Sequence, residues 1–133
     1  MKASICSQCV IEKDGTLYCM MNSKYNKIAP IGGKGEEKEA PLDILKRELR
    51  EEVGNVCIEK IDYLGKHTHV RDDKSEVEVH LYKVKINPEN ELEAKEDFLE
   101  IIPIHLVLEK ITSITAYTSL CAIVDILKLK ECV

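Results

Sequence analysis

Three glutamates stand close together in one segment, and their spacing indicates the chemistry that this chain could perform. Glu48, Glu51 and Glu52 lie within the run KRELREEVG. At 100° per residue on an α-helix they fall within an arc of roughly 100°, so the three carboxylates would share one face. Carboxylates gathered in this way repel one another and are stable near neutral pH only with protons, basic partners or bound cations. The spacing therefore predicts a site for a hard divalent cation, Mg²⁺ first and Mn²⁺ as the alternative.

The helix that carries these glutamates is predicted to run from Pro41 to Val53. Pro41 suits a first-turn position, and Gly54 suits the position that follows the last turn. The buried stripe is predicted from apolar residues at helical spacing, which are Leu42, Leu45, Leu49 and Val53. Packing that stripe would leave the glutamates at the edge of the core, partly sheltered from water.

A charged, solvated helix face is the alternative interpretation, and it would suit a lone pair of glutamates. The spacing of further residues argues against it, because the segment resembles the Nudix box, G-x5-E-x7-R-E-U-x-E-E-x-G-U with U an aliphatic residue. The matching residues are Gly33, Glu39, Arg47, Glu48, Leu49, Glu51, Glu52 and Gly54. Only the last position departs from the pattern, because Asn55 stands where an aliphatic residue is usual.

The resemblance to Nudix (MutT-like) hydrolases implies that water attacks a phosphorus of a nucleoside diphosphate linked to another group, X. It implies that Glu51 and Glu52 are the principal metal ligands and that Glu48 is a ligand or the general base. Arg47 would hold a helix carboxylate in place by a charge-assisted hydrogen bond. The implied catalytic residues are therefore Glu48, Glu52 and Arg47.

Two further metal ligands are implied outside the helix. The carbonyl of Gly32 is one candidate, because glycine lets the backbone approach a metal or phosphate closely. Some relatives carry an additional glutamate late in the chain, and Glu100 resembles it, with Glu93 and Glu96 as rivals. The expected ligand set is Glu48, Glu51, Glu52, Gly32 and Glu100.

The sequence indicates the residues that contact substrate less specifically than it indicates the metal ligands. The expected contacts are Gly33, Lys34, Glu39, Tyr25 and Tyr82. The two tyrosines are chosen because the chain has no Trp to stack on a base. Ile28 and Ala29 stand where many relatives carry Trp or Asn, so base recognition is expected to be unusual.

Three functions follow from the resemblance. The first is a nucleoside triphosphate pyrophosphohydrolase, and the second is a hydrolase of ADP-ribose, ADP-sugars or dinucleoside polyphosphates. The third belongs to another class, a non-catalytic nucleotide-sensing domain, which would be expected to have lost glutamates of the box. Since none is lost, catalysis is favoured.

Two other groupings are weaker signals. Cys6 and Cys9 have zinc-like spacing, but no second pair completes four ligands, and strand positions three apart face opposite sides. His67 and His69 could share a strand face and bind a metal, although an isolated pair of this kind is more often a polar surface or a substrate contact.

The remaining elements predict an α/β fold, a Nudix-type α/β/α sandwich with a mixed central sheet, in a single domain over residues 1–133. The expected elements are a hairpin over Ala3–Asn22 with its turn at Asp14-Gly15, a loop over Lys24–Lys38 with one short strand, strands over Val56–Val70 and Glu76–Ile86 joined by a turn over Arg71–Lys74, a surface loop over Asn87–Asp97, and helices over Ile104–Ile111 and Thr115–Lys130. The final helix is expected to cover the sheet.

Composition limits the partners. A net charge of -5 without a Lys/Arg block disfavours nucleic-acid polymers, so the expected partner is a small nucleotide. No apolar run approaches the roughly 20 residues of a membrane span, and the start lacks the features of a signal peptide, so the expected location is the cytoplasm. The six cysteines are then expected to be buried or free thiols. The family resemblance is compatible with a monomer or a homodimer.

Overall fold

The computed structural model describes residues 4–111 and 118–129, and its centre is a seven-stranded sheet. The strands are β1 (Ser4–Lys13), β2 (Thr16–Asn22), β3 (Lys27–Ala29), β4 (Ile31–Lys34), β5 (Ile58–Val70), β6 (Glu76–Ile86) and β7 (Leu99–Pro103). The helices are α1 (Pro41–Val53), the 3-10 helix η1 (Ile104–Leu106), α2 (Leu108–Ile111) and α3 (Thr118–Ile126).

The sheet is mixed, as predicted. Its path runs β3-β2-β1-β6-β5, while β4 pairs with β1 and β7 pairs with β2. Strand β1 runs parallel to β6, and the other pairings are antiparallel. The predicted hairpin is formed by β1 and β2, and its turn residues Asp14 and Gly15 both have positive φ, which such tight turns favour. Residue 3, where the hairpin was expected to begin, lies outside the described residues.

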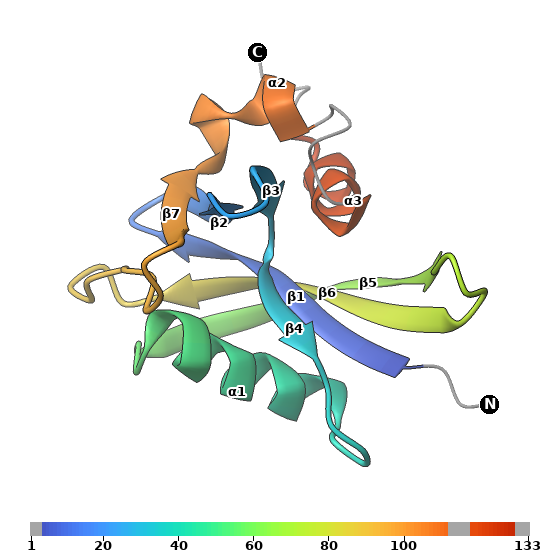
Figure 1. The fold of residues 1–133 in the computed structure, drawn as a ribbon. Coiled ribbons are helices and arrows are strands. Elements are labelled where there is room, and N and C mark those ends of the chain that lie inside the picture. The colour runs from blue at the N-terminus through green and yellow to red at the C-terminus, as the bar shows by residue number, and fades with distance from the viewer. Residues whose placement is uncertain (1–3, 112–117, 130–133) are drawn as a thin grey trace.

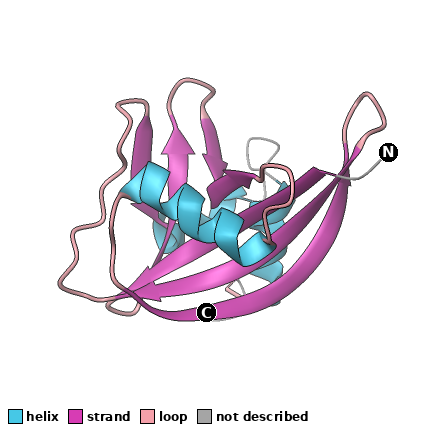
Figure 2. Cartoon of the chain, turned by 90° about the horizontal axis from the view of Figure 1, so that it is seen from below, coloured by secondary structure: helices cyan, strands magenta, loops and turns pink. Residues whose placement is uncertain are grey.

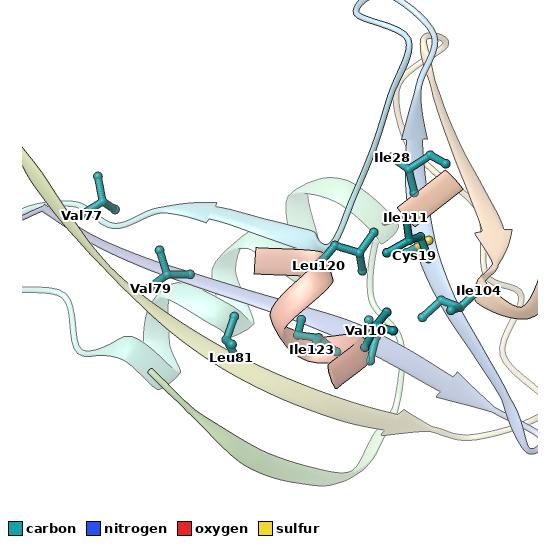
Figure 3. Close-up of a cluster of buried hydrophobic side chains, with 11 residues drawn as sticks. Val10, Cys19, Ile28, Val77, Val79, Leu81, Ile104, Ile111, Leu120 and Ile123 are labelled. Carbon is teal, nitrogen blue, oxygen red and sulfur yellow. The ribbon is translucent and has the colours of Figure 1, made fainter. Parts of the chain in front are cut away.

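Helices cover both faces of this sheet. Figure 1 shows α1 below the long strands and α3 above them, and Figure 2 shows α1 crossing the strands on its own face. The core on the α1 face consists of Cys9, Ile11, Met20, Ile31, Leu45, Leu49, Val53, Tyr82, Val84 and Ile86. The core on the α3 face consists of Val10, Cys19, Ile28, Val77, Val79, Leu81, Ile104, Ile111, Leu120, Ile123 and Val124, most of which Figure 3 labels. The layers therefore form the predicted α/β/α sandwich.

Helix α1 has the predicted bounds, but one member of its predicted buried stripe is wrong. Leu42 is 41% exposed, whereas Ile44 is fully buried. Ile44 packs under the chain at Gly35, where an added Cβ would lie 2.2 Å from the Cδ1 of Ile44. Periodicity within the helix carries no information about this neighbouring segment, so it predicted the wrong residue.

Several other boundaries differ from the prediction. The segment Lys24–Lys38 contains two short strands instead of one, and β7 was not predicted. The expected helix over Ile104–Ile111 is divided into η1 and α2. Helix α3 is shorter than predicted within the described residues, and positions 115–117 and 130 of that prediction lie outside them. None of the described helices has the length and hydropathy of a membrane span.

Candidate active site

Two glycines bring β4 against the glutamate face of α1. Gly32 has a φ of +143°, and a Cβ there would lie 2.1 Å from the backbone oxygen of Ser7, so no other residue fits this conformation. Its N–H donates a hydrogen bond to Glu52 Oε2 at 3.0 Å. A Cβ on Gly33 would lie 2.8 Å from the carboxyl group of Glu48. The paired glycines therefore make room for two of the three carboxylates.

Arg47 connects the helix to the loop before it. Its guanidinium donates to Glu39 through Nε at 2.8 Å and Nη2 at 3.0 Å, and Nη2 also donates to the backbone oxygen of Lys34 at 3.1 Å. Nη1 donates to Glu48 at 3.1 Å and to Glu51 at 3.3 Å. The hydrogen bond from Arg47 holds the pKa of Glu39 at about 2, well below its usual value. This network orients Glu48 and Glu51 on the same side of the helix.

Two of the three helix carboxylates are poorly solvated. Burial raises the pKa of Glu52 to about 8, although the hydrogen bond from Gly32 opposes the rise, and the charges of Glu48, Glu51 and Glu96 add to it. Burial also raises the pKa of Glu48, whose side chain is 13% exposed, and Arg47 opposes that rise. Glu51 is 56% exposed. A cation bound here would relieve the cost of ionising the two sheltered groups.

The chemistry of these donors fits a hard divalent cation. Among residues 4–111 and 118–129, no three His, Cys, Asp or Glu side chains converge closely enough to hold an ion. The reason is their present partners, since Glu48 and Glu51 turn toward Arg47, and Glu52 accepts from Gly32. All three groups offer carboxylate oxygen from one helix face, which is the ligand type that Mg²⁺ and Mn²⁺ prefer.

A fourth glutamate lies near Glu52, and it is not the one that was favoured. Glu96 lines the same hollow as Glu52 and Gly32, and its charge raises the pKa of Glu52. Glu100 instead lies exposed on β7, opposite Met21 of β2. Lys95 explains the placement of Glu96, because its N–H donates to the backbone oxygen of Glu52 at 2.8 Å. A main-chain contact of this kind leaves no sequence signal.

The two tyrosines predicted to contact substrate are placed differently. Tyr25 is 61% exposed, and its ring lies near the ammonium of Lys24. The same ammonium is 5.8 Å from the centre of the Phe98 ring, and Phe98 lines the hollow that contains Glu52. Tyr82 is 5% exposed and packs in the core beneath α1. The same core cluster contains Leu45 and Leu49 of α1. Tyr82 is therefore a core residue in this structure.

The cysteines and histidines can also be placed. Cys6 packs toward α3 and Cys9 toward α1, so the pair lies on opposite faces of β1, as predicted. The described cysteines are all free thiols, namely Cys6, Cys9, Cys19, Cys57 and Cys121, while Cys132 lies outside the described residues. His67 and His69 line one cavity on the α3 face, which the glutamates do not line.

The comparisons with known proteins agree with this geometry. The chain matches the family profile of the NUDIX domain over residues 8–119. The chain belongs to the Nudix family. This match confirms the resemblance inferred from the box, and the layers and sheet confirm the predicted fold class. The protein is accordingly a Nudix hydrolase that acts on phosphorus-containing anhydrides, and divalent metal ions are general cofactors of such hydrolases.

Several solved structures share its fold at low sequence identity. The solution structure of the E. coli ORF135 protein gives a TM-score of 0.71 at 20% identity, covering 99% of this chain and 93% of that one. The MutT protein from Methanosarcina mazei Go1 gives a TM-score of 0.71 at 14% identity, and the match covers 98% of this chain and 96% of that one. The NUDIX domain of Shewanella oneidensis NrtR, solved in complex with ADP ribose, gives a TM-score of 0.71 at 14% identity, and the match covers 98% of this chain and 90% of that one. No curated protein matches the chain.

Proposed function

We propose that this Nudix hydrolase is a nucleoside triphosphate pyrophosphohydrolase that depends on Mg²⁺, with Mn²⁺ as a substitute. The observation that carries this proposal is the set of three carboxylates on α1, two of which have a raised pKa, beside the Gly32-Gly33 segment. Such a set is stable in its ionised form when a divalent cation binds it. When bound, the metal would polarise the phosphoryl oxygens and stabilise charge that develops on them.

The residues of the site are assigned metal-binding, general-base and positioning roles. Glu51 and Glu52, with the Gly32 carbonyl, would hold the cation. Glu96 is proposed as the further metal ligand in place of Glu100. Glu48 is the proposed general base, because its carboxyl group lies against Gly33 and its raised pKa brings it closer to neutral pH. Arg47 is a positioning residue that fixes Glu48 through the hydrogen bond at 3.1 Å.

The substrate would enter beside the glycines. Gly33 and Lys34 end the short strand β4 next to Glu48, where the diphosphate would lie. Glu39 supports this contact indirectly by holding Arg47. Tyr25 is the remaining aromatic candidate for a stacked base, since its ring is exposed near the rim of the Glu52 hollow. We propose that the protein acts on a free small-molecule nucleotide, as a monomer or a homodimer.

A second candidate is hydrolysis of ADP-ribose or a related dinucleotide. One observation favours it, namely that the NUDIX domain of Shewanella oneidensis NrtR was solved with ADP ribose. A sensing domain without catalysis is the third candidate. The intact glutamate set argues against it, since a domain that only binds nucleotide has no need of a general base held by Arg47.

Product analysis over a nucleotide panel tests these candidates. The panel contains the nucleoside triphosphates, ADP-ribose, dinucleoside polyphosphates and NADH, each with Mg²⁺ and with Mn²⁺. The proposal expects pyrophosphate and a nucleoside monophosphate from at least one triphosphate, at a higher kcat/KM than for any other substrate. Preferential release of AMP and ribose phosphate from ADP-ribose would support the second candidate. Nucleotide binding by calorimetry without turnover would support the third.

A further inference from the structure

A chain of hydrogen-bonded side chains lies on β5 and β6, and the proposed hydrolysis does not use it. Tyr82 belongs to the core on the α1 face, and His80 and Glu78 precede it on β6 by two and four residues, so they project to the same face. Tyr63 of β5 lies opposite Tyr82, with the ring centres 5.2 Å apart. Figure 1 shows both strands extending beyond α1 toward the turn that joins them. Tyr63 is 54% exposed, so this part of the α1 face is open to solvent.

Glu78 holds one end of this chain in a fixed charge state. Its Oε2 lies 2.9 Å from His80 Nε2, and its Oε1 accepts a hydrogen bond from Lys66 Nζ at 3.0 Å. The hydrogen bonds from His80 and Lys66 hold the pKa of Glu78 below its usual value, so the carboxyl group is ionised at neutral pH. An ionised carboxylate can only accept hydrogen bonds, so the proton between Glu78 and His80 lies on Nε2.

The position of that proton decides how His80 contacts Tyr63. The Tyr63 hydroxyl lies 2.9 Å from His80 Nδ1. In the neutral imidazole, a proton on Nε2 leaves a lone pair on Nδ1, so Nδ1 accepts and the phenol donates. The His80 side chain is 12% exposed and is held at both ring nitrogens. An imidazole that a carboxylate orients in this way is a base for a hydroxyl nucleophile, as in the serine-histidine-aspartate arrangement.

A positive charge lies near the Tyr63 oxygen. The hydrogen bond to Glu78 raises the pKa of Lys66, and the charge of Tyr63 adds to the rise. The ammonium is therefore near enough to stabilise negative charge that develops on the phenol oxygen. Tyr25 offers a comparison, because it is 61% exposed but its hydroxyl has no hydrogen-bond partner within residues 4–111 and 118–129. The Lys24 ammonium lies 5.6 Å from the centre of the Tyr25 ring, so the base is the feature that distinguishes Tyr63.

We propose that Tyr63 is a nucleophilic modification site with His80 as its general base. It takes an acyl group from a donor with a good leaving group, such as an activated ester. The phenol oxygen attacks the carbonyl carbon, and the new C–O bond forms as the bond to the leaving group breaks. The phenol proton passes to His80 Nδ1 and from there to the departing anion. Glu78 is a positioning residue that keeps His80 in the required tautomer, and the product is a tyrosine ester on an exposed part of the sheet.

Acetylation by p-nitrophenyl acetate tests this site in the native protein. The reaction is run in EDTA at neutral pH, and the acetyl groups are located and quantified over time by peptide mass spectrometry. Tyr63 should be acetylated about a hundredfold faster than Tyr25, which is the lower end of the contribution of a general base. Tyr25 is the internal control, because it is the more exposed of the two and accessibility alone would favour it. Acetylation of cysteines and lysines is resolved in the same spectra and does not enter this ratio.

His80→Gln separates the role of a base from that of a structural contact. The glutamine oxygen can still accept a hydrogen bond from the Tyr63 hydroxyl, but it cannot take up the proton. Acetylation of Tyr63 should be about a hundredfold slower in this variant, with the rate at Tyr25 unchanged. Glu78→Gln should slow Tyr63 about tenfold, the loss expected for one charge-assisted hydrogen bond. Glu76→Gln removes the same charge from an exposed position of β6 and should leave the rate at Tyr63 unchanged.

Two results would overturn the inference. One is equal acetylation of Tyr63 and Tyr25 in the native protein, and the other is an unchanged rate at Tyr63 in His80→Gln while that variant is folded by circular dichroism. If His80→Gln does not fold, the comparison of Glu78→Gln with Glu76→Gln decides, and equal rates at Tyr63 in these two variants overturn the inference. The experiment contains neither metal nor nucleotide, so its outcome is independent of whether the protein hydrolyses nucleotides.

Discussion

Replacing Glu52 by Gln should change the stability of the metal-free protein in a way that depends on pH. The amide keeps an oxygen that can accept the hydrogen bond from Gly32, now 3.0 Å long, but it carries no charge. Burial raises the pKa of Glu52 from 4.5 to about 8. The folded protein therefore holds this proton more tightly than the unfolded chain does. Its stabilising effect is complete below pH 4.5 and is lost as the pH rises toward 8.

The size of this effect follows from the pKa difference. Each pKa unit corresponds to about 1.4 kcal/mol, so a rise from 4.5 to about 8 corresponds to a loss on the order of 5 kcal/mol between pH 4.5 and pH 8. A domain is stabilised by only about 5–15 kcal/mol in total, so the loss is large enough to measure. Glu52→Gln lacks this titration, and its free energy of unfolding should exceed that of the native protein increasingly as the pH rises.

Urea unfolding with EDTA, from pH 5 to pH 9, measures this difference. Adding Mg²⁺ at 100 times its dissociation constant should restore about 2.7 kcal/mol to the native protein at high pH, and much less to Glu52→Gln. Arg50→Gln, at an exposed position of the same helix, controls for a change in helix charge. The same pH dependence of stability in the native and Glu52→Gln proteins without metal would show that Glu52 does not hold its proton in this way.

Three further comparisons test the placement of the other residues. Gly33→Ala should lower kcat by about a hundredfold with little loss of stability, because its Cβ would displace the Glu48 carboxyl group, whereas Gly32→Ala should destabilise the fold through its clash with Ser7. Kinetics and thermal unfolding of both variants measure these two effects, and full activity of Gly33→Ala would contradict the placement of Glu48. Glu96→Gln should weaken metal affinity about tenfold or more while Glu100→Gln should not, as measured by calorimetry. Ile44→Ala should cost about 2–5 kcal/mol of stability and Leu42→Ala less than about 1, and equal losses in urea unfolding would mean that the burial of α1 is misassigned.

The parts of the fold that depend on local pattern could be predicted from the sequence. The Asp14-Gly15 turn identified the hairpin, and Pro41 with Gly54 gave the bounds of α1. The pattern over Glu76–Ile86 identified β6 with its observed bounds. These features are set by residues close in sequence, whose backbone preferences and periodicity act without help from distant segments.

The features that were missed depend on contacts between distant segments. Strand β7 forms against β2, and its short sequence has no alternation of its own to indicate it. The sequence left Glu96 as a rival of Glu100 and could not choose between them, because Glu96 is placed near Glu52 by the hydrogen bond from Lys95 N–H to the backbone oxygen of Glu52, a contact between positions far apart in the chain. Tyr82 was expected to contact substrate, but it packs in a core cluster with side chains from β1, β2, β4 and α1. The spacing of the box placed the three carboxylates on one face of α1, whereas their neighbours from other segments depend on tertiary packing.

The rate of pyrophosphate release from nucleoside triphosphates should be measured as a function of Mg²⁺ concentration, in the native protein and in Glu52→Gln. We expect saturable activation by Mg²⁺ in the native protein and a loss of activity in Glu52→Gln at every Mg²⁺ concentration, with both proteins folded. Equal rates in the two proteins, or release that continues in EDTA, would contradict a metal site built on the carboxylates of α1.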